Sequence, residues 1–263
     1  MFTKLKLRSA ASSTFFMFWI LLAIAPASAR ELSTDRPDQT ESPYTVENRR
    51  LQAEFQIASA GRDGTASRWA WQLGGLNVKR GLSNRADLQL VFPGVESAPA
   101  GAERETGVGD LTVRLKWNLR GNDRPGIAVG FMPYVTLPTG AKGFTAGGWE
   151  VGLILPVAVP APGGAGLGLM AQGDIVRDGD GEGAHPEGFF TATVGRDLAG
   201  PLGGFVEIAA RARPRAEGSN PLALDVGVTY GLGEDVQLDA GVQWGLGGDA
   251  EDERYFIGYT VRR

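Results

Sequence analysis

The sequence predicts an all-β fold, a transmembrane antiparallel up-and-down β-barrel of about 12 strands in a bacterial outer membrane. Three observations predict it. Apolar and polar residues alternate position by position in several segments, and such a period of two is typical of strands with two different faces. Glycine is abundant, at 39 of 263 residues, which disfavours long helices. Beyond the N-terminus, no apolar stretch approaches the ~20 residues of a membrane-spanning helix.

The N-terminus has the pattern of a signal peptide. Three cations precede an apolar run at residues 15–25, and small residues follow, ending in Ala27-Ser28-Ala29. The apolar run is too short for a spanning helix, and the Ala-x-Ala pattern places a cleavage point before Arg30. We therefore expect residues 1–29 to be a cleaved signal peptide that exports the chain.

Alternation and turn residues together place the strands of residues 49–263. Segments 51–57, 111–119, 206–213 and 236–244 alternate most clearly, with one apolar face and one face of charged and amide side chains. Extending the pattern between turn signals gives about twelve strands, at residues 50–60, 68–79, 85–94, 107–120, 125–138, 148–159, 165–176, 187–198, 203–214, 221–232, 235–246 and 253–262.

The connections between these segments alternate in length. Those after every second strand are short, whereas residues 95–106, 139–147 and 177–186 form longer stretches rich in Gly, Ala, Asp and Glu. Short periplasmic turns and long extracellular loops are typical of outer-membrane barrels. An even number of strands then leaves both chain ends in the periplasm.

The aromatic residues distinguish a membrane barrel from a soluble β-sandwich, which would also alternate apolar and polar residues. Trp and Tyr favour the boundary between lipid and water. Most of them fall near strand ends here, and the strands have the length that a tilted strand needs to cross a bilayer. We expect an outer girdle of Trp69, Trp71, Trp149, Trp244 and Tyr255, and an inner girdle that contains Trp117 and Tyr230.

The opening of the mature chain resembles a known family. Residues 34–46, with the sequence TDRPDQTESPYTV, are followed by LQAE at 51–54, and the last strand contains GYTVR at 258–262. These segments resemble the "MetA-pathway of phenol degradation" outer-membrane family. The resemblance implies a transporter-like barrel that is associated by name with the breakdown of aromatic compounds.

Residues 30–48 form a charged periplasmic segment that contains Asp35, Arg36, Asp38 and Glu41. Two prolines favour an extended backbone here, because the residue before proline avoids the helical region. Two interpretations remain open. The segment is either a solvated lead-in to the barrel, or a partial plug that folds into the barrel mouth and pairs with lumen charges.

The polar face of the strands should line the lumen, where each charge needs a partner or water. Barrels of about twelve strands lie between small barrels filled by side chains and large barrels with an open channel, so we expect a narrow, partly obstructed pore. We predict that its selectivity depends on six inward-facing residues: Glu54, Arg114, Lys116, Asp174, Glu207 and Arg211.

These features predict a passive outer-membrane channel for small solutes, including aromatic compounds such as phenols. The alternative is a non-conducting structural or interaction barrel whose acidic surface loops bind partners. The predicted surroundings are outer-membrane lipid and a small-molecule solute. A net charge of −4 argues against nucleic acid as a partner. The sequence predicts no oligomeric state.

Enzymatic and metal chemistry find little support in the sequence. There is no cysteine, and the one histidine, His185, falls in a predicted loop, whereas Ser-His-Asp chemistry and most metal hydrolysis rely on histidine. Residues 178–183 imitate the start of a calcium loop, but the twelfth position is Phe189 where such a loop has glutamate. We therefore expect neither a catalytic residue nor a cofactor, and we interpret 178–183 as a solvated acidic loop.

Overall fold

The computed structural model describes residues 30–63, 68–100, 103–178, 183–214 and 219–263. The expected signal peptide at 1–29 lies outside these residues. No helix in the described part of the chain has the length and apolarity to span a membrane. The elements are β1 Leu51–Asp63, β2 Arg68–Ser83, β3 Ala86–Phe92, β4 Val95–Ala100, β5 Glu103–Val108, β6 Leu111–Arg120, β7 Ala128–Leu137, β8 Glu150–Ala161, the short 3-10 turn η1 Pro162–Gly164, β9 Ala165–Arg177, β10 Ala184–Ala199, β11 Leu202–Ala212, β12 Leu222–Gly231, β13 Val236–Gly247 and β14 Glu253–Arg262.

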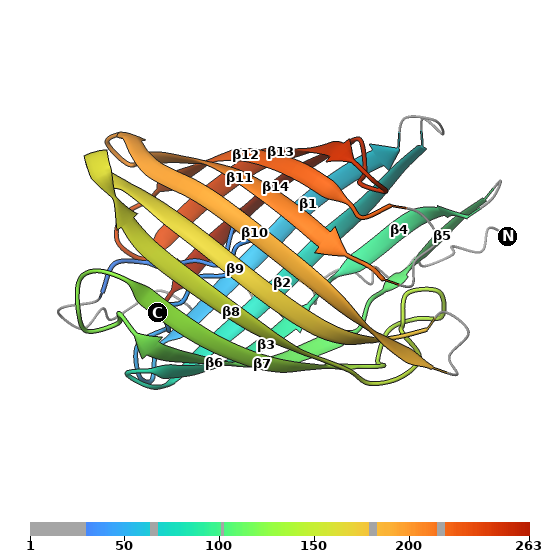
Figure 1. Cartoon of the computed structure of the whole chain (residues 1–263), viewed down its shortest axis with the longest axis horizontal. Coiled ribbons are helices and arrows are strands. Elements are labelled where there is room, and N and C mark those ends of the chain that lie inside the picture. Colours follow the sequence, from blue (N-terminus) through green and yellow to red (C-terminus); the bar gives the residue numbers. More distant parts are fainter. Residues whose placement is uncertain (1–29, 64–67, 101–102, 179–182, 215–218) are drawn as a thin grey trace, which may run out of the picture.

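The strands form one antiparallel sheet that closes on itself (Figure 1). β1 pairs with β2 on one side and with β14 on the other, and this pairing of first and last strands completes the barrel. Two of the wall strands are each built from two pieces, because β4 continues β3 along β2, and β5 leads into β6. The barrel therefore has twelve strands, which confirms the predicted fold.

The twelve observed strands overlap the twelve predicted ones, and the main correction concerns residues 95–106. This stretch was expected to be a loop, but most of it forms the β4–β5 hairpin, paired from Val95 with Val108 to Ala100 with Glu103. The sequence here has the pattern of a loop, because Pro93, Gly94 and Pro99 interrupt the alternation typical of a strand and the hairpin is polar in composition. Pairing between β4 and β5 nevertheless satisfies the backbone hydrogen-bonding groups of the hairpin.

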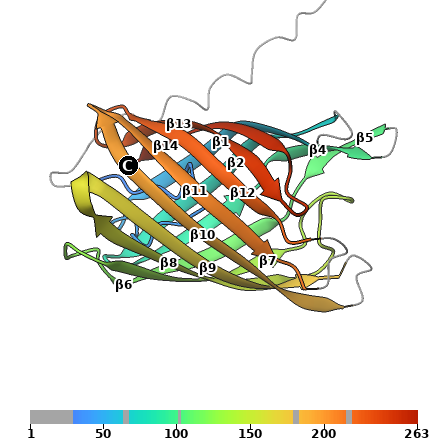
Figure 2. The ribbon, with the colours of Figure 1, turned by 45° about the horizontal axis from the view of Figure 1, so that its top comes forward.

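The two ends of the barrel differ. We call the end with the short connections the turn rim, and the opposite end the loop rim. The short connections are at residues 84–85, 121–127, 162–164, 200–201 and 232–235. Gly200 and Gly233 have φ values of 55° and 81° in these turns, a conformation that other residues rarely adopt. β1 begins and β14 ends at the turn rim, where the backbone of Leu51 exchanges two hydrogen bonds with Arg263. Figure 2 shows the strands inclined to the barrel axis, as closure requires.

The outer face is apolar and the interior largely polar, the reverse of a soluble protein. Large apolar side chains such as Ile57, Leu155, Val194 and Ile208 are exposed on the outside, whereas many of the buried side chains are charged. The two aromatic girdles lie where they were predicted, except that Trp71 is only partly exposed. The exposed members are Trp69, Trp149, Trp244 and Tyr255 toward the loop rim, and Trp117 and Tyr230 toward the turn rim.

We predict that the folded protein migrates faster on an unheated detergent gel than after boiling. A closed barrel has no free edge at which detergent can begin to separate the strands, so it stays compact until heated. Electrophoresis of the same sample with and without boiling tests this expectation. Equal mobility of the two samples would argue against a closed barrel.

Candidate functional site: the lumen and the N-terminal segment

Residues 30–48, which we call the N-terminal segment, lie inside the turn-rim half of the barrel (blue in Figure 1). The segment starts at the turn rim, where Nη1 of Arg262 donates a hydrogen bond to the carbonyl of Glu31 (3.2 Å). It returns there near Val46, whose N–H donates to Asp87 Oδ2 of β3 (2.9 Å). Between these points it contacts inward-facing side chains from opposite sides of the lumen.

Asp35 lies between two buried lysines. Lys116 of β6 donates from Nζ to one carboxylate oxygen (2.5 Å), and Lys79 of β2 donates to the other. Lys79 also donates to Glu54 of β1, whose carboxylate accepts the N–H of Asp35 (3.0 Å). Both lysines are only 1% exposed. Loss of one partner of such a buried pair costs about 3–5 kcal/mol, so this cluster holds the segment firmly.

The middle of the segment contacts the last strands of the barrel. Arg36 makes a two-point contact with Asp239 of β13, at 2.7 Å and 3.3 Å. Glu207 of β11 accepts the backbone N–H groups of Gln39 and Thr40, both at 2.8 Å. Among the ion pairs of the described residues, neither of these carboxylates is paired with a lysine or arginine of the wall. The segment therefore supplies their donors.

Glu41 makes a further ionic contact of the segment. Its Oε1 lies 2.5 Å from Nη1 of Arg114 on β6. This is the one hydrogen bond between the two side chains. Arg114 Nε and Glu41 Oε2 are both buried and have no hydrogen-bond partner. The guanidinium of Arg114 also lies 5.9 Å from the ring centre of Tyr134 on β7. The N–H of Glu41 points at the sulfur of Met170, 3.4 Å away.

The predicted lumen residues all face inward, but they divide into two groups. Glu54, Lys116 and Glu207 are at most 2% exposed and bind the N-terminal segment. Asp174 accepts hydrogen bonds from Tyr134 and Gln172. Arg211 lies nearer the loop rim, with its guanidinium 4.6 Å from the ring centre of Phe189 and 3.7 Å from Glu187. Arg114 borders both groups.

The sequence did not predict an apolar patch on the inner wall. Met132, Ile154, Met170, Phe189 and Ala209 are buried and in contact with one another, and Tyr134 packs against them. They come from five successive strands, β7 to β11. In β7 and β8 both faces are apolar, so alternation could not assign a side. The loss of alternation in these two strands was itself the available signal.

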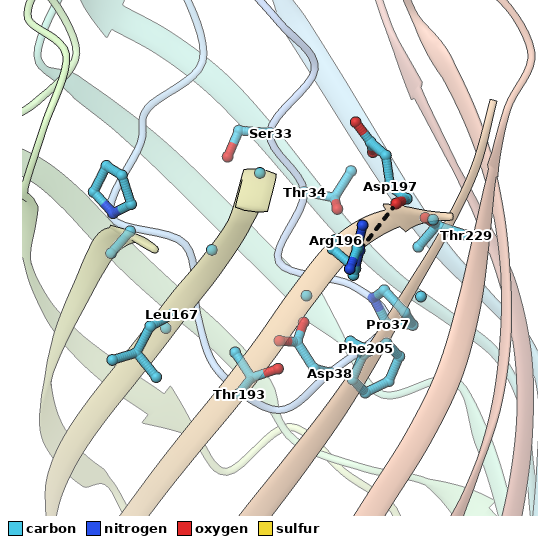
Figure 3. Close-up of a pocket in the computed structure, with 18 of the residues that line it drawn as sticks. Ser33, Thr34, Pro37, Asp38, Leu167, Thr193, Arg196, Asp197, Phe205 and Thr229 are labelled. Atoms are coloured by element: carbon cyan, nitrogen blue, oxygen red, sulfur yellow. Dashed lines mark hydrogen bonds between the residues drawn. The ribbon is translucent and has the colours of Figure 1, made fainter. Parts of the chain in front are cut away.

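Small residues leave space beside the N-terminal segment. A cavity of about 520 Å³ lies between the segment and the wall formed by β8 to β12 at the turn rim (Figure 3). Asp38, Thr193 and Phe205 border it, as Figure 3 shows, and Gly166 and Gly195 are among the glycines that line it. A second cavity of about 610 Å³ lies on the other side of the segment, also at the turn rim.

Arginines also hold the turn rim together around Asp235, in the connection between β12 and β13. Burial raises the pKa of Asp235, but hydrogen bonds from Arg262 (2.8 Å) and Arg50 (3.0 Å) outweigh this effect and hold the pKa below its usual value. A carboxylate with a lowered pKa stabilises the fold at neutral pH. This contribution is lost as the pH falls below the ordinary aspartate value of about 4 through the lowered pKa.

No group of three or more potential metal-binding side chains occurs among the described residues. Most of the calcium-loop imitation falls on residues 179–182, which lie outside them. His185 is the second residue of β10 and does not lie in a loop; its Nδ1 is 2.5 Å from Asp178 Oδ1 and its Nε2 is 3.5 Å from Glu187 Oε1. These contacts place the histidine among carboxylates at the loop rim.

Comparison with known proteins identifies the family. Residues 34–262 match the family described as "Putative MetA-pathway of phenol degradation". The chain belongs to this family. The matched region includes most of the N-terminal segment as well as the barrel. A comparison with curated proteins gave no match.

Several solved structures share the fold. The COG4313 outer membrane channel from Pseudomonas putida F1 superimposes with a TM-score of 0.64 at 16% identity, over 88% of this chain and 100% of that one. The NanC porin gives 0.54 at 11% identity, over 80% and 98% of the two chains. The KdgM porin gives 0.54 at 8% identity, over 81% and 98%. At these identities the likeness concerns the fold of the barrel.

We predict that the Asp35 cluster controls access to the N-terminal segment. Thr40→Cys introduces a single thiol into a chain without cysteine, at a position only 6% exposed. The thiol should react slowly with a water-soluble maleimide. In an Asp35→Asn background, Lys79 and Lys116 lose a charged partner, and we expect labelling to accelerate more than about tenfold, equivalent to 1.4 kcal/mol of easier opening.

The matched control is Arg85→Gln in the same Thr40→Cys background. Arg85 pairs with Asp123 at the turn rim, and both side chains are about half exposed, so the pair contributes little. Its loss should leave the labelling rate unchanged. Equal rates in all three proteins would mean that the buried ion pairs do not hold the segment.

Proposed function

We propose that this protein is an outer-membrane channel for passive uptake of small solutes, with small aromatic compounds as the solute class. The observation that carries the proposal is the reversed polarity of a closed barrel, with apolar strand faces outside and a charged, partly hollow lumen inside. The family name supports the aromatic class. In this proposal the apolar band contacts lipid, the turn rim faces the periplasm, and residues 1–29 are removed on export.

The N-terminal segment acts in this proposal as a partial plug. Its contacts with Asp239, Glu207 and Arg114 cross the lumen from the late strands to β6. Space lies beside the segment in the cavities of about 520 and 610 Å³. In this proposal solutes pass through the first of these cavities, along the small-residue wall of β8 to β12. A narrow path of this kind suits molecules of the size of one aromatic ring.

Lumen charges set selectivity in this proposal, but unequally. Glu54, Lys116 and Glu207 are occupied by the N-terminal segment, so they act mainly through the position of the plug. Arg114, Asp174 and Arg211 border the part of the lumen between the segment and the loop rim. These three residues act on the solute directly. Lumen substitutions tune selectivity in such barrels, whereas charges on the lipid face destabilise the fold.

Planar-bilayer recording tests the channel. Purified protein, shown to be folded by its mobility on an unheated gel, should give discrete current steps in chloride salts. Folded protein without current would support a non-conducting barrel instead. For the solute class, a strain that lacks the gene should grow more slowly than the wild type on a single aromatic carbon source and equally well on acetate.

We predict that filling the cavity of about 520 Å³ closes the main path. Gly166 of β9 lines this cavity, and a side chain added there meets no atom within 4 Å. Gly166→Trp should therefore fold and lower single-channel conductance by about half or more, because an indole would fill much of a narrow lumen. Recording in symmetrical salt measures the effect.

Gly173→Trp is the matched control on the same strand. Gly173 pairs with Gly188 and Leu153 on the outer face, and a side chain added there also meets no atom within 4 Å. An outward tryptophan contacts lipid and leaves the lumen unchanged. If the two variants conducted equally, the cavity would not be on the ion path.

A further inference from the structure

We propose that the solutes bound in the lumen are small carboxylates with an apolar, aromatic body, and that they bind by taking the place of Glu41 on Arg114. This inference rests on the proposed channel function and names its solute more closely. It differs from the expectation for phenols, which are neutral at physiological pH. Three features of the lumen carry it: an incomplete ion pair, an apolar patch beside the pair, and the charge balance around it.

The Arg114–Glu41 pair is incomplete. A guanidinium and a carboxylate can form two parallel hydrogen bonds, and arginine is favoured wherever carboxylates are recognised in this way. Here only Nη1 and Oε1 meet, at 2.5 Å. Nε of Arg114 and Oε2 of Glu41 are both buried and have no partner. The geometry therefore leaves at Arg114 an unused donor for a second carboxylate oxygen.

Glu41 cannot improve this contact without moving its neighbours. The preceding residue, Thr40, is held by its backbone N–H and its hydroxyl, which both donate to Glu207, at 2.8 and 2.5 Å. A free carboxylate has no such tether and can turn to use two donors of Arg114. A solute with this group can therefore compete with a residue of the protein's own chain for the same arginine.

The apolar patch lies beside Arg114. The ring of Tyr134 faces the guanidinium and packs against the cluster of Met132, Ile154, Met170 and Phe189. Methionine sulfur and aromatic side chains make favourable contacts with a further ring. Met170 is also the residue whose sulfur faces the N–H of Glu41, so the arginine and the patch meet at one point of the segment. A solute with one charged end and one flat apolar end matches both surfaces.

The charge balance favours an anion over a neutral ring. Asp35, Lys79 and Lys116 form a closed set of contacts beside Arg114, so they offer it no free carboxylate. If a phenol displaced Glu41, Arg114 would lose the ion-pair contact that it makes with the segment, which is unfavourable for a largely buried guanidinium. A carboxylate restores the pair that it breaks, so Arg114 keeps an ion-pair partner when Glu41 turns away from it.

Benzoate, acetate, phenol and benzylamine test the inference as solutes with a ring and a negative charge, a negative charge alone, a ring alone, and a ring with a positive charge. They are added to single channels that carry chloride current. We expect benzoate to block the current at the lowest concentration, acetate to need about ten times more, and phenol and benzylamine to have no effect in this range.

Variants locate the effect. Arg114→Gln should abolish the benzoate block, whereas Glu41→Gln removes the competing charge and should lower the blocking concentration of benzoate about tenfold. Tyr134→Leu should weaken the benzoate block and leave the response to acetate unchanged. Glu41→Gln and Tyr134→Leu keep the test decisive if Arg114→Gln does not fold. Arg85→Gln removes a cation at the turn rim and should respond as the wild type does.

The outcomes separate the two proposals. Folded protein that carries no chloride current would overturn the channel function itself. A conducting channel that responds equally to benzoate, acetate and phenol would overturn the solute assignment and leave the channel standing. A benzoate block that persists in folded Arg114→Gln, or that is unchanged in Glu41→Gln, would show that the solute does not exchange with Glu41.

Discussion

The shared carboxylate of Asp35 determines how the interior of this barrel is organised. Lys79 and Lys116 project inward from β2 and β6, on either side of β3, and each binds one of the two oxygens of this carboxylate. Two ammonium groups at such burial would be strongly unfavourable without a negative partner. Glu54 pairs with Lys79, and the buried Asp87 of β3 lies between the two strands, but among the ion pairs of the described residues only Asp35 contacts both lysines. The two buried lysines of the wall are therefore stabilised by Asp35, and the same ion pairs fix the position of the segment.

The lumen is consequently two-sided. Charged and amide side chains concentrate on β1 to β6, whereas β7 to β11 present methionine, isoleucine and phenylalanine at mid-height and glycine near the turn rim. Arg114 and Tyr134 lie where the two sides meet. The N-terminal segment pairs Asp35 and Glu41 with the first side and Arg36 with β13, and it leaves the cavity of about 520 Å³ along the second side. Its position therefore follows the distribution of charge on the wall.

The sequence predicted the barrel well because its strands have two chemically distinct faces. Glu54, Lys116 and Glu207 alternate with outward apolar residues, so their inward direction followed from period two alone. Their partners did not follow. The extended segment around Asp35 has no periodicity, so its charges left open both a solvated lead-in and a plug, and could not identify partners on strands as distant as β13. The apolar patch was missed for the opposite reason, since β7 and β8 are apolar on both faces.

The contacts of Arg36 have a consequence for the order of assembly. This one guanidinium donates to Asp239 of β13 and to Gln56 of β1, and so it bridges the junction at which the last strand meets the first. In an open sheet these two acceptors belong to opposite ends of the wall and cannot be reached together. The residues that leave the ribosome among the first thus complete their contacts only when the strands that leave last are in place. Closing the cylinder therefore brings together the two acceptors that fix Arg36 in the interior.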